Sequence, residues 1–571
     1  MTREETLALF AQGRDAWNGW AKQMLAERKA LEAAGKFPAR EGLPPPPEAQ
    51  DWLDRARGDF SGETATHEFP AGVDFSGFVF PGDARFGSAT FTGDTRFDSA
   101  TFERNAWFYI ATFNGEARFN RATFKGHTEF ASARFKSRAG FAGATFEGTA
   151  MFSGTTFVSN AWFRTATFAD RAEFDGARFS GEAQFGIVKY HSDASFYGAT
   201  FTGNAGFDST TFEGQARFGR ARFSGNAGFG NATFKGDAWF AGVTVESDAW
   251  FHRVTFKRNA RFERVTFMGD ARFGGAAFQG NTWFESSTFK GDAEFTGTTF
   301  KGIACLTSAT FGKTSSFDGA VFHGSASFHA AEGKGAFSLA GARFHAVPDF
   351  IQAHFGEAPR LDNVRVEPPP MRLSTRAGRK KYFNGDRDLA ARWRALKRLA
   401  IQGHDHGREL EFFARELKAR RFVEDKWLSA PFLFGWLYQW FSDFGRSVLR
   451  PLGAWAVSTA AFAGLYLSVA GSSSSCLAGS GTPWGAALGI SLHKGLVFIG
   501  QGSSAVLDRY YACLYGFHSM STVHPPPVPL PERFVSVIPD AAFNLGLAQA
   551  LVSAVFIFLI LLALRNHFRI K

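Results

Sequence analysis

Few residues of this chain have the type and spacing that catalysis or metal binding requires. Three cysteines are too few for a disulfide-stapled scaffold or a cysteine-rich zinc module. His404, Asp405 and His406 could bind a metal, but Gly403 and Gly407 flank them, which favours a polar turn. No nucleophile motif, phosphate-binding loop or acid pair is apparent. The sequence therefore predicts a protein that is not an enzyme and that holds no cofactor or metal.

The charge of the chain is distributed unevenly. Residues 61–330 contain 26 basic and 26 acidic residues, whereas residues 371–450 contain 18 basic and 9 acidic residues. The basic excess lies beside the apolar carboxyl-terminal third, where it favours anionic lipid headgroups. This distribution argues against a nucleic-acid partner. Residues 1–36 have no uncharged apolar core, so we expect no secretory signal peptide.

A phenylalanine recurs at alternating intervals of six and five residues over about half of the chain. The series runs from Phe69 to Phe328 and has 48 positions. Only three of them hold another residue, namely Tyr190, Val245 and Leu306. Such a period is typical of repeat architectures, in which stacked units form one continuous core. The predicted core ladder includes Phe91, Phe97, Phe102, Phe108, Phe113, Phe119, Phe218 and Phe223.

The residues between the phenylalanines favour short strands over helix. An eleven-residue period also fits a right-handed coiled coil, but frequent Gly, as at Gly93 and Gly115, and Thr beside Phe disfavour helix. Gly suits tight turns, and Thr suits a pleated surface. A small residue commonly lies two positions before the Phe, as Ala100 does before Phe102, and so points to the same side.

The motifs A-T-F-x-G and A-x-F-x-x resemble the pentapeptide-repeat family, in a Phe-rich variant. The resemblance implies a mainly β fold, a right-handed quadrilateral β-helix. One extra residue in every second unit departs from the strict five-residue form and leaves the coil cross-section open. If four units make a coil of about 22 residues, about 12 coils give a rod roughly 55 Å long.

The sequence predicts four regions. Residues 1–60 form an N-terminal helical cap with a Pro-rich linker, and residues 61–355 form the solenoid. Residues 371–426 form a basic helical adaptor, and residues 427–571 form a membrane region. Thr2 and Glu5 predict a capping box and Gly35 a helix stop, bounding one amphipathic helix. This helix caps the open solenoid end or, alternatively, binds a partner.

Two apolar segments, residues 449–470 and 541–564, are long enough to span a membrane. Arg446 precedes the first segment, Arg450 lies at its start before the uncharged stretch from Leu452, and Arg565 follows the second segment. The positive-inside rule therefore predicts that both termini and the solenoid are cytoplasmic. The aromatic residues of 427–441 predict a helix lying in the membrane interface. The family resemblance implies a bacterial source and hence the cytoplasmic (inner) membrane.

Between the two segments lies an outer loop with a shorter apolar segment, residues 484–500. The order resembles pore-loop channels in outline, with Gly500, Gln501 and Gly502 at the place of a potassium filter, although the filter's Thr and Tyr are absent. The alternative is a short re-entrant or interfacial helix in a simple anchor. The loop also holds Cys476 and Cys513, and an oxidising outer side predicts a disulfide between them, whereas Cys305 lies in the solenoid.

The leading interpretation is a non-enzymatic scaffold, a cytoplasmic rod that is anchored to the membrane and binds an unidentified protein partner. The alternative is an oligomeric, ion-channel-like protein with the solenoid as its cytoplasmic domain. Some members of the resembled family protect DNA gyrase by imitating DNA, which requires an acidic face. The balanced charge of the repeat argues against that role here.

Overall fold

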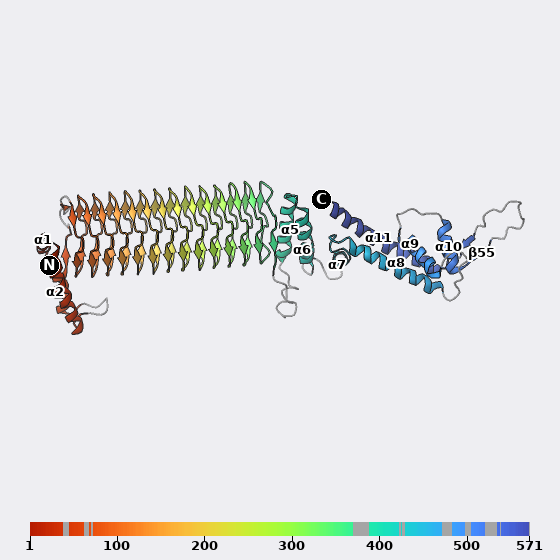
Figure 1. Cartoon of the computed structure of the whole chain (residues 1–571), viewed down its shortest axis with the longest axis horizontal. Coiled ribbons are helices and arrows are strands. Elements are labelled where there is room, and N and C mark those ends of the chain that lie inside the picture. The colour runs from red at the N-terminus through yellow and green to blue at the C-terminus, as the bar shows by residue number, and fades with distance from the viewer. Residues whose placement is uncertain are drawn as a thin grey trace. The chain divides into compact units, whose positions relative to one another are not determined.

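The computed structural model describes residues 1–37, 45–61, 68–69, 72–368, 387–421, 424, 429–470, 482–496, 504–519, 534–536 and 538–569 (Figure 1). Contacts divide the chain into two compact units. The first comprises Met1–Met371 and Arg398–Gly403, and the second comprises Arg372–Lys397 and His404–Lys571. The first unit is a solenoid with N-terminal helices. The second is helical and contains the two candidate transmembrane helices.

The solenoid has four sides, each a parallel sheet of two-residue strands (Figure 1). Within a sheet, paired residues are 22 positions apart, as Phe113 is from Phe91 and from Phe135. The predicted quadrilateral arrangement of four units per coil is thus confirmed. The four sheets are named faces A to D. Face A runs from β1 (Gly58–Asp59) to β49 (Ala326–Ser327), and face B from β2 (Glu68–Phe69) to β53 (His354–Phe355). Face C runs from β3 (Val73–Asp74) to β51 (Phe337–Ser338), and face D from β4 (Val79–Phe80) to β54 (Arg365–Val366).

The core consists of phenylalanine rings stacked along each face. The rings of Phe91 and Phe113 are 4.7 Å apart and nearly parallel, with an interplanar angle of 4°. The rings of Phe91 and Phe97, on neighbouring faces, meet edge to face at 84° and 6.4 Å. Both arrangements suit the aromatic quadrupole. The eight ladder residues named above are all buried. Stacking therefore fills the interior without a separate hydrophobic layer.

The extra residue of every second unit has a structural explanation. Units that leave faces A and C are five residues long and turn at a residue with positive φ, such as Ser88 (60°) and Ser99 (56°). Units that leave faces B and D are six residues long, and their corners stack closely. A Cβ added at Gly115 would lie 2.4 Å from the carbonyl carbon of Gly93 in the coil before it. Glycine is thus selected at this corner by backbone contact between coils.

The solenoid has about 14 coils, more than the twelve expected from the series Phe69 to Phe328, because it begins before that series at β1 and continues beyond it to β54. Gly333 interrupts the ladder on face B, and the ring of Phe337 packs 5.5 Å from Phe311 and 4.5 Å from Phe355 around the gap. Phe337 occupies a position that a small residue holds elsewhere, so the two changes offset each other in volume. The alternating spacing then resumes at Leu339, Phe344, Phe350, Phe355, Leu361 and Val366.

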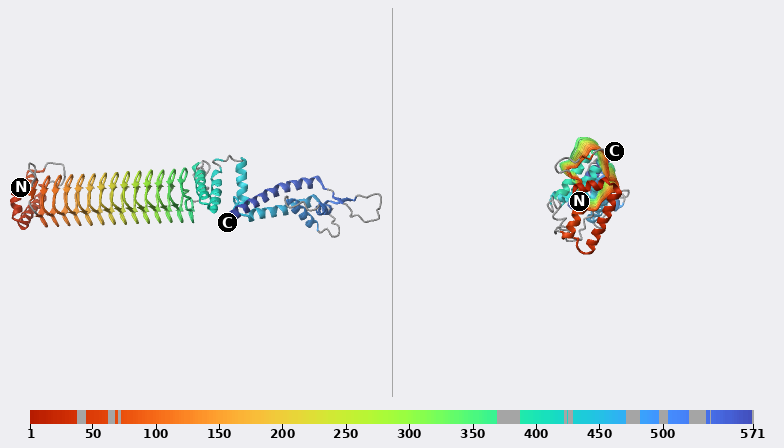
Figure 2. Two further views of the ribbon diagram at one scale, coloured as in Figure 1. Left: turned by 90° about the horizontal axis from the view of Figure 1, so that it is seen from above. Right: turned by 90° about the vertical axis from the view of Figure 1, so that its left-hand side faces the viewer.

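Three helices cover the first coil, namely α1 (Arg3–Ala11), α2 (Arg14–Ala33) and α3 (Pro47–Ala56). The capping box of Thr2 and Glu5 is formed. The single helix expected between Thr2 and Gly35 was wrong, since Gly13 has a φ of 92° and separates α1 from α2. The end-on view in Figure 2 shows these helices at the start of the solenoid.

The side chains of α2 bind the first coil directly. The indole nitrogen of Trp17 donates to the carbonyl oxygen of Val79 at 2.8 Å, and its ring packs against Phe60 and Phe80. The Asn18 amide donates to the Gly77 carbonyl and accepts from the Val79 N–H, both at 3.0 Å. The bond from the Val79 N–H takes the place of the bond to a preceding coil, since the Thr101 N–H one coil later donates to the Phe78 carbonyl. The helices therefore cap the otherwise unpaired edge.

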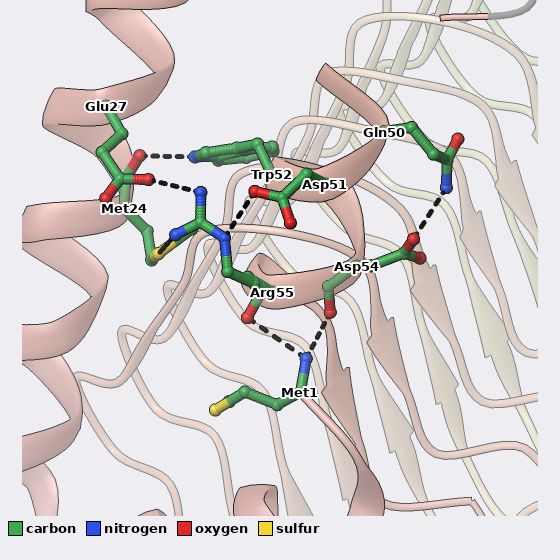
Figure 3. A network of polar contacts seen from close by, with 8 residues as sticks. All are labelled: Met1, Met24, Glu27, Gln50, Asp51, Trp52, Asp54 and Arg55. Atoms are coloured by element: carbon green, nitrogen blue, oxygen red, sulfur yellow. Dashed lines mark hydrogen bonds and ion pairs between the residues drawn. The ribbon is translucent and has the colours of Figure 1, made fainter. Parts of the chain in front are cut away.

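A polar network joins the cap helices to each other (Figure 3). Arg55 of α3 forms ion pairs with Glu27 of α2 at 3.0 Å and with Asp51 at 2.8 Å. The pKa of Arg55 is raised, first by its hydrogen bond to Glu27 and then by that to Asp51. The Trp52 indole N–H donates to the carbonyl oxygen of Met24 at 2.7 Å (Figure 3). The network fixes α3 against α2.

The last described segment of the first unit is the end of a helix, α5 (Arg387–Gln402). The Gln402 amide donates to the carbonyl oxygen of Phe355 at 2.8 Å. In the second unit, α5 pairs with α6 (His406–Arg420), and the buried Glu416 accepts from Arg394 at 2.8 Å and from Lys397 at 2.6 Å. This helical pair lies within residues 371–426, for which a basic helical adaptor was predicted.

The remaining helices of the second unit lie in the expected membrane region. They are α7 (Ala430–Ser442), α8 (Leu449–Ala470), α9 (Pro483–Gly495), α10 (Ser504–Tyr515) and α11 (Asp540–Arg569), with a hairpin of β55 (Phe517–Ser519) and β56 (Phe534–Ser536). By length and composition, α8 and residues Asp540–Phe568 of α11 are candidate membrane spans. Two spans near the carboxyl terminus were predicted from the sequence.

Candidate functional site

The outer surface of the solenoid is set by the residue that precedes each ladder position. Because successive strand residues point to opposite sides, this residue faces outward when the phenylalanine faces inward. On faces B and D it is most often Thr, as in Thr112 and Thr123. Faces A and C instead carry Trp, Arg, Glu and Gln in the same column. The outward tryptophans are Trp107, Trp162, Trp239, Trp250 and Trp283.

Three of the outward residues on face A form an aromatic–guanidinium stack. The guanidinium of Arg261 lies 4.4 Å from the ring centroid of Trp239 in the preceding coil and 5.1 Å from that of Trp283 in the following coil. Cation–π contacts of this kind hold the three side chains in a fixed order. We name Trp239, Arg261 and Trp283 the face-A stack. Tryptophan and arginine are the residues most enriched at protein-binding hot spots.

A column of charged side chains follows face D at the corner of the coil. Lys125 pairs with Glu103 at 2.8 Å, and Lys235 pairs with Glu213 at 2.8 Å. Glu213 also lies 3.1 Å from the Nδ1 atom of His191. Hydrogen bonds from Lys235 and His191 lower the pKa of Glu213 to about 2. The two partners of each pair lie 22 residues, or one coil, apart, so these contacts follow from the repeat and do not form a catalytic cluster.

Comparison with known families decides what the solenoid is. A family described as Pentapeptide repeats (9 copies) matches residues 75–123, 111–156, 196–244, 207–255, 240–288 and 284–332. The solenoid belongs to the pentapeptide-repeat family. Comparisons with curated proteins and with solved structures found no match.

The sequence reasoning treated this pentapeptide-repeat solenoid only as a core and did not predict which residues cover its outer surface. The signal was present, because every outward Trp directly precedes a ladder Phe, as in Trp239–Phe240. Cys305 occupies the same outward column of face A and is half-buried. Its position in the solenoid matches the expectation from the sequence.

The second unit places α9 between the two candidate spans. The Ser491 hydroxyl on α9 donates to the carbonyl oxygen of Thr459 on α8 at 2.6 Å. The Gln549 amide on α11 donates to the carbonyl oxygen of Ser491 at 2.7 Å. Ser491 and Gln549 are fully buried. A short helix is therefore bonded to both long helices through polar groups, which are costly inside a membrane unless they are paired.

Two sequence predictions fall partly outside the described residues. Gly500, Gln501 and Gly502 of the suggested pore loop lie outside them, as does Cys476. Cys513 lies on α10 and is buried beside Tyr511 and Leu514. The Cys476–Cys513 disulfide and the pore loop therefore stay predictions.

The residues His404 to His406 form a helix cap. The carboxylate of Asp405 accepts from the Arg408 N–H at 3.0 Å as the N-cap of α6, and His406 lies 3.1 Å from Glu409. Among the residues that the structure describes, no three or more His, Cys, Asp and Glu lie close enough together to hold a metal ion. The arrangement matches the polar turn favoured by the flanking glycines.

Proposed function

We propose that this protein is a membrane-anchored scaffold whose pentapeptide-repeat solenoid binds a protein partner in the cytoplasm. The face-A stack carries the proposal, because it presents two tryptophans and an arginine in fixed order on a rigid surface. The two candidate spans support anchoring, and the solenoid is generally a non-catalytic fold. The basic residues of the adaptor support contact with anionic lipid.

The partner can be tested by native mass spectrometry of the full chain extracted from its own membranes in mild detergent. We expect a complex with a second polypeptide. Replacing Trp239, Arg261 and Trp283 by Ser should release that polypeptide, because the stack is then gone. A matched triple replacement of Thr145, Thr167 and Thr211 by Ser on face D should retain it. A complex built only of copies of this chain would contradict the scaffold.

That last result would favour the second candidate, an oligomeric ion-channel-like protein. The observation in its favour is the position of α9, which is hydrogen-bonded to both α8 and α11. A short helix between two spans is the order of pore-loop channels. A pore requires several copies around an axis, whereas a scaffold does not. The number of copies in the complex therefore separates the two candidates.

The proposed location is a bacterial cytoplasmic membrane, with the solenoid and both termini on the cytoplasmic side. The basic residues next to the spans, such as Arg446 and Arg565, support this orientation. The orientation can be tested by labelling single cysteines in a variant whose native cysteines are replaced by Ala. A membrane-impermeant maleimide is added to cells whose outer membrane is permeabilised and whose cytoplasmic membrane is intact. We expect Ser99→Cys to be protected and Arg509→Cys on α10 to react. Both positions are exposed, so reversed labelling would mean the opposite orientation.

A further inference from the structure

A groove of about 630 Å³ lies along face A and the corner that follows it, beside the face-A stack. Its floor is formed by the small residues Gly219, Ala241 and Gly242. An ideal Cβ at Gly242 would meet only the Arg220 side chain, at 3.8 Å, so open space surrounds this position. The walls are built from Tyr197, Gln215, Arg217, Arg220, Trp239 and Arg264.

The groove is cationic. Arg217, Arg220 and Arg264 line it and are exposed, and no carboxylate is among its lining residues. Arg217 donates to Gln215 at 2.9 Å and lies 3.9 Å from Asp193. Arg220 and Arg264 form no ion pair with any described residue. Three guanidinium groups thus line one hollow, and two of them, those of Arg220 and Arg264, have no ion pair with a described residue.

Some other arginines of the solenoid are paired with carboxylates on neighbouring coils. Arg258 lies 3.7 Å from Asp237, and Arg138 lies 3.5 Å from Glu116. The groove therefore gathers three arginines and no lining carboxylate in a repeat whose total charge is balanced.

Two aromatic rings complete the walls of the groove. Tyr197 is 45% exposed, and the guanidinium of Arg220 lies 5.8 Å from its ring centroid. Trp239 borders the groove and also stacks with Arg261. The Nε1 atom of Trp239 is buried without a hydrogen-bond acceptor.

A second hollow, of about 480 Å³, provides an internal comparison on face C. Trp250, Arg253 and Arg272 line it, but so does the carboxylate of Glu294. Arg272 is also paired with Asp270 at 3.3 Å. A carboxylate thus lines the face-C hollow together with its arginines, whereas none lines the groove on face A.

We propose that the face-A groove binds a short acidic segment of the partner protein, with carboxylates on the three arginines and an aromatic side chain beside Tyr197 and Trp239. This inference rests on the proposed scaffold function and names the chemistry of the partner. Planar guanidinium groups bind carboxylates with good geometry, and they stack on aromatic rings. Neighbouring carboxylates, such as Glu263 and Asp193, would repel a long polyanion, which favours a short peptide over nucleic acid.

The inference can be tested with purified full-length protein in detergent and a fluorescein-labelled octapeptide of alternating Glu and Tyr, measured by fluorescence anisotropy. We expect binding that weakens with added salt. Replacing both Arg220 and Arg264 by Ser should weaken it about tenfold, because two charge-assisted contacts are lost. Ser already occupies the equivalent left-handed position at Ser286, with a φ of 55°, so the variant should fold.

Two variants separate the groove from general surface charge. Ala241→Phe fills the groove without changing its charge and should also weaken binding. Arg272→Ser removes an arginine from face C and should leave binding unchanged. An octapeptide with Gln in place of Glu should bind at least tenfold more weakly than the acidic one.

Several outcomes would overturn the inference. These are the absence of octapeptide binding, equal binding by the Arg220→Ser/Arg264→Ser variant, and tighter binding of an eight-nucleotide single-stranded DNA at the same arginines. None of them bears on the co-purified polypeptide, which is the test of the scaffold itself. Conversely, a complex made only of copies of this chain would contradict the proposed scaffold function even if the octapeptide bound.

Discussion

Replacing Phe218 by Asp is expected to unfold the solenoid around its middle coils. The ring of Phe218 is fully buried and stacks at 4.9 Å on Phe196 and, on its other side, on Phe240. It also meets Phe207 and Phe229 edge to face at 5.3 Å. A carboxylate in this column would have no partner, and burying an unpaired charge costs far more than a solenoid coil can supply.

The milder variant Phe218→Ala should lower the free energy of unfolding by about 3–5 kcal/mol, with the lower value if neighbouring rings collapse into the cavity. Thermal melting followed by circular dichroism, together with limited proteolysis, measures both variants. Lys257→Asp places the same new charge on an exposed corner and should melt like the parent. If Phe218→Asp also melted like the parent, the phenylalanine ladder would not be the core.

Much of the solenoid could be predicted because a single physical requirement is repeated along it. Each coil buries almost nothing alone, so every ladder position must be apolar, and the spacing of Phe reveals the coil length of 22 residues. The end of the solenoid could not be placed from the sequence, because a small residue, Gly333, occupies a Phe position there and Phe337 occupies the position of a small residue. That the large residue compensates for the small one can be recognised only once both are known to lie in the same part of the core.

The surface features were less accessible to sequence reasoning. A groove depends on which small residues stack beside which long ones in successive coils, as Gly219 and Ala241 do beside Arg220. These residues are 22 positions apart or at a corner, so their proximity follows from the coil and not from local motifs. The N-terminal break at Gly13 was missed for a different reason. The apolar positions on both sides keep helical spacing, and only the φ of 92° separates the helices.

Replacing Trp17 by Ala is expected to uncover the first coil and to make the protein self-associate. Trp17 is fully buried, and its ring packs 5.8 Å from Phe60 and 5.5 Å from Phe80. Its removal should cost about 3–5 kcal/mol of the cap's docking energy. Once α2 detaches, the backbone groups of Gly77 and Val79 also lose their bonds to Asn18, leaving an unpaired edge that can pair with another chain.

Sedimentation velocity over a range of protein concentrations measures the association, and chemical denaturation measures the loss of stability. Trp107→Ala is the matched control, because Trp107 lies on the outer side of face A and supports no cap contact. It should remain at the parent's association state. A Trp17→Ala protein that sedimented and unfolded like the parent would show that the helices do not hold the solenoid end closed. The N-terminal region would then be free for the alternative role expected from its amphipathic sequence, the binding of a partner.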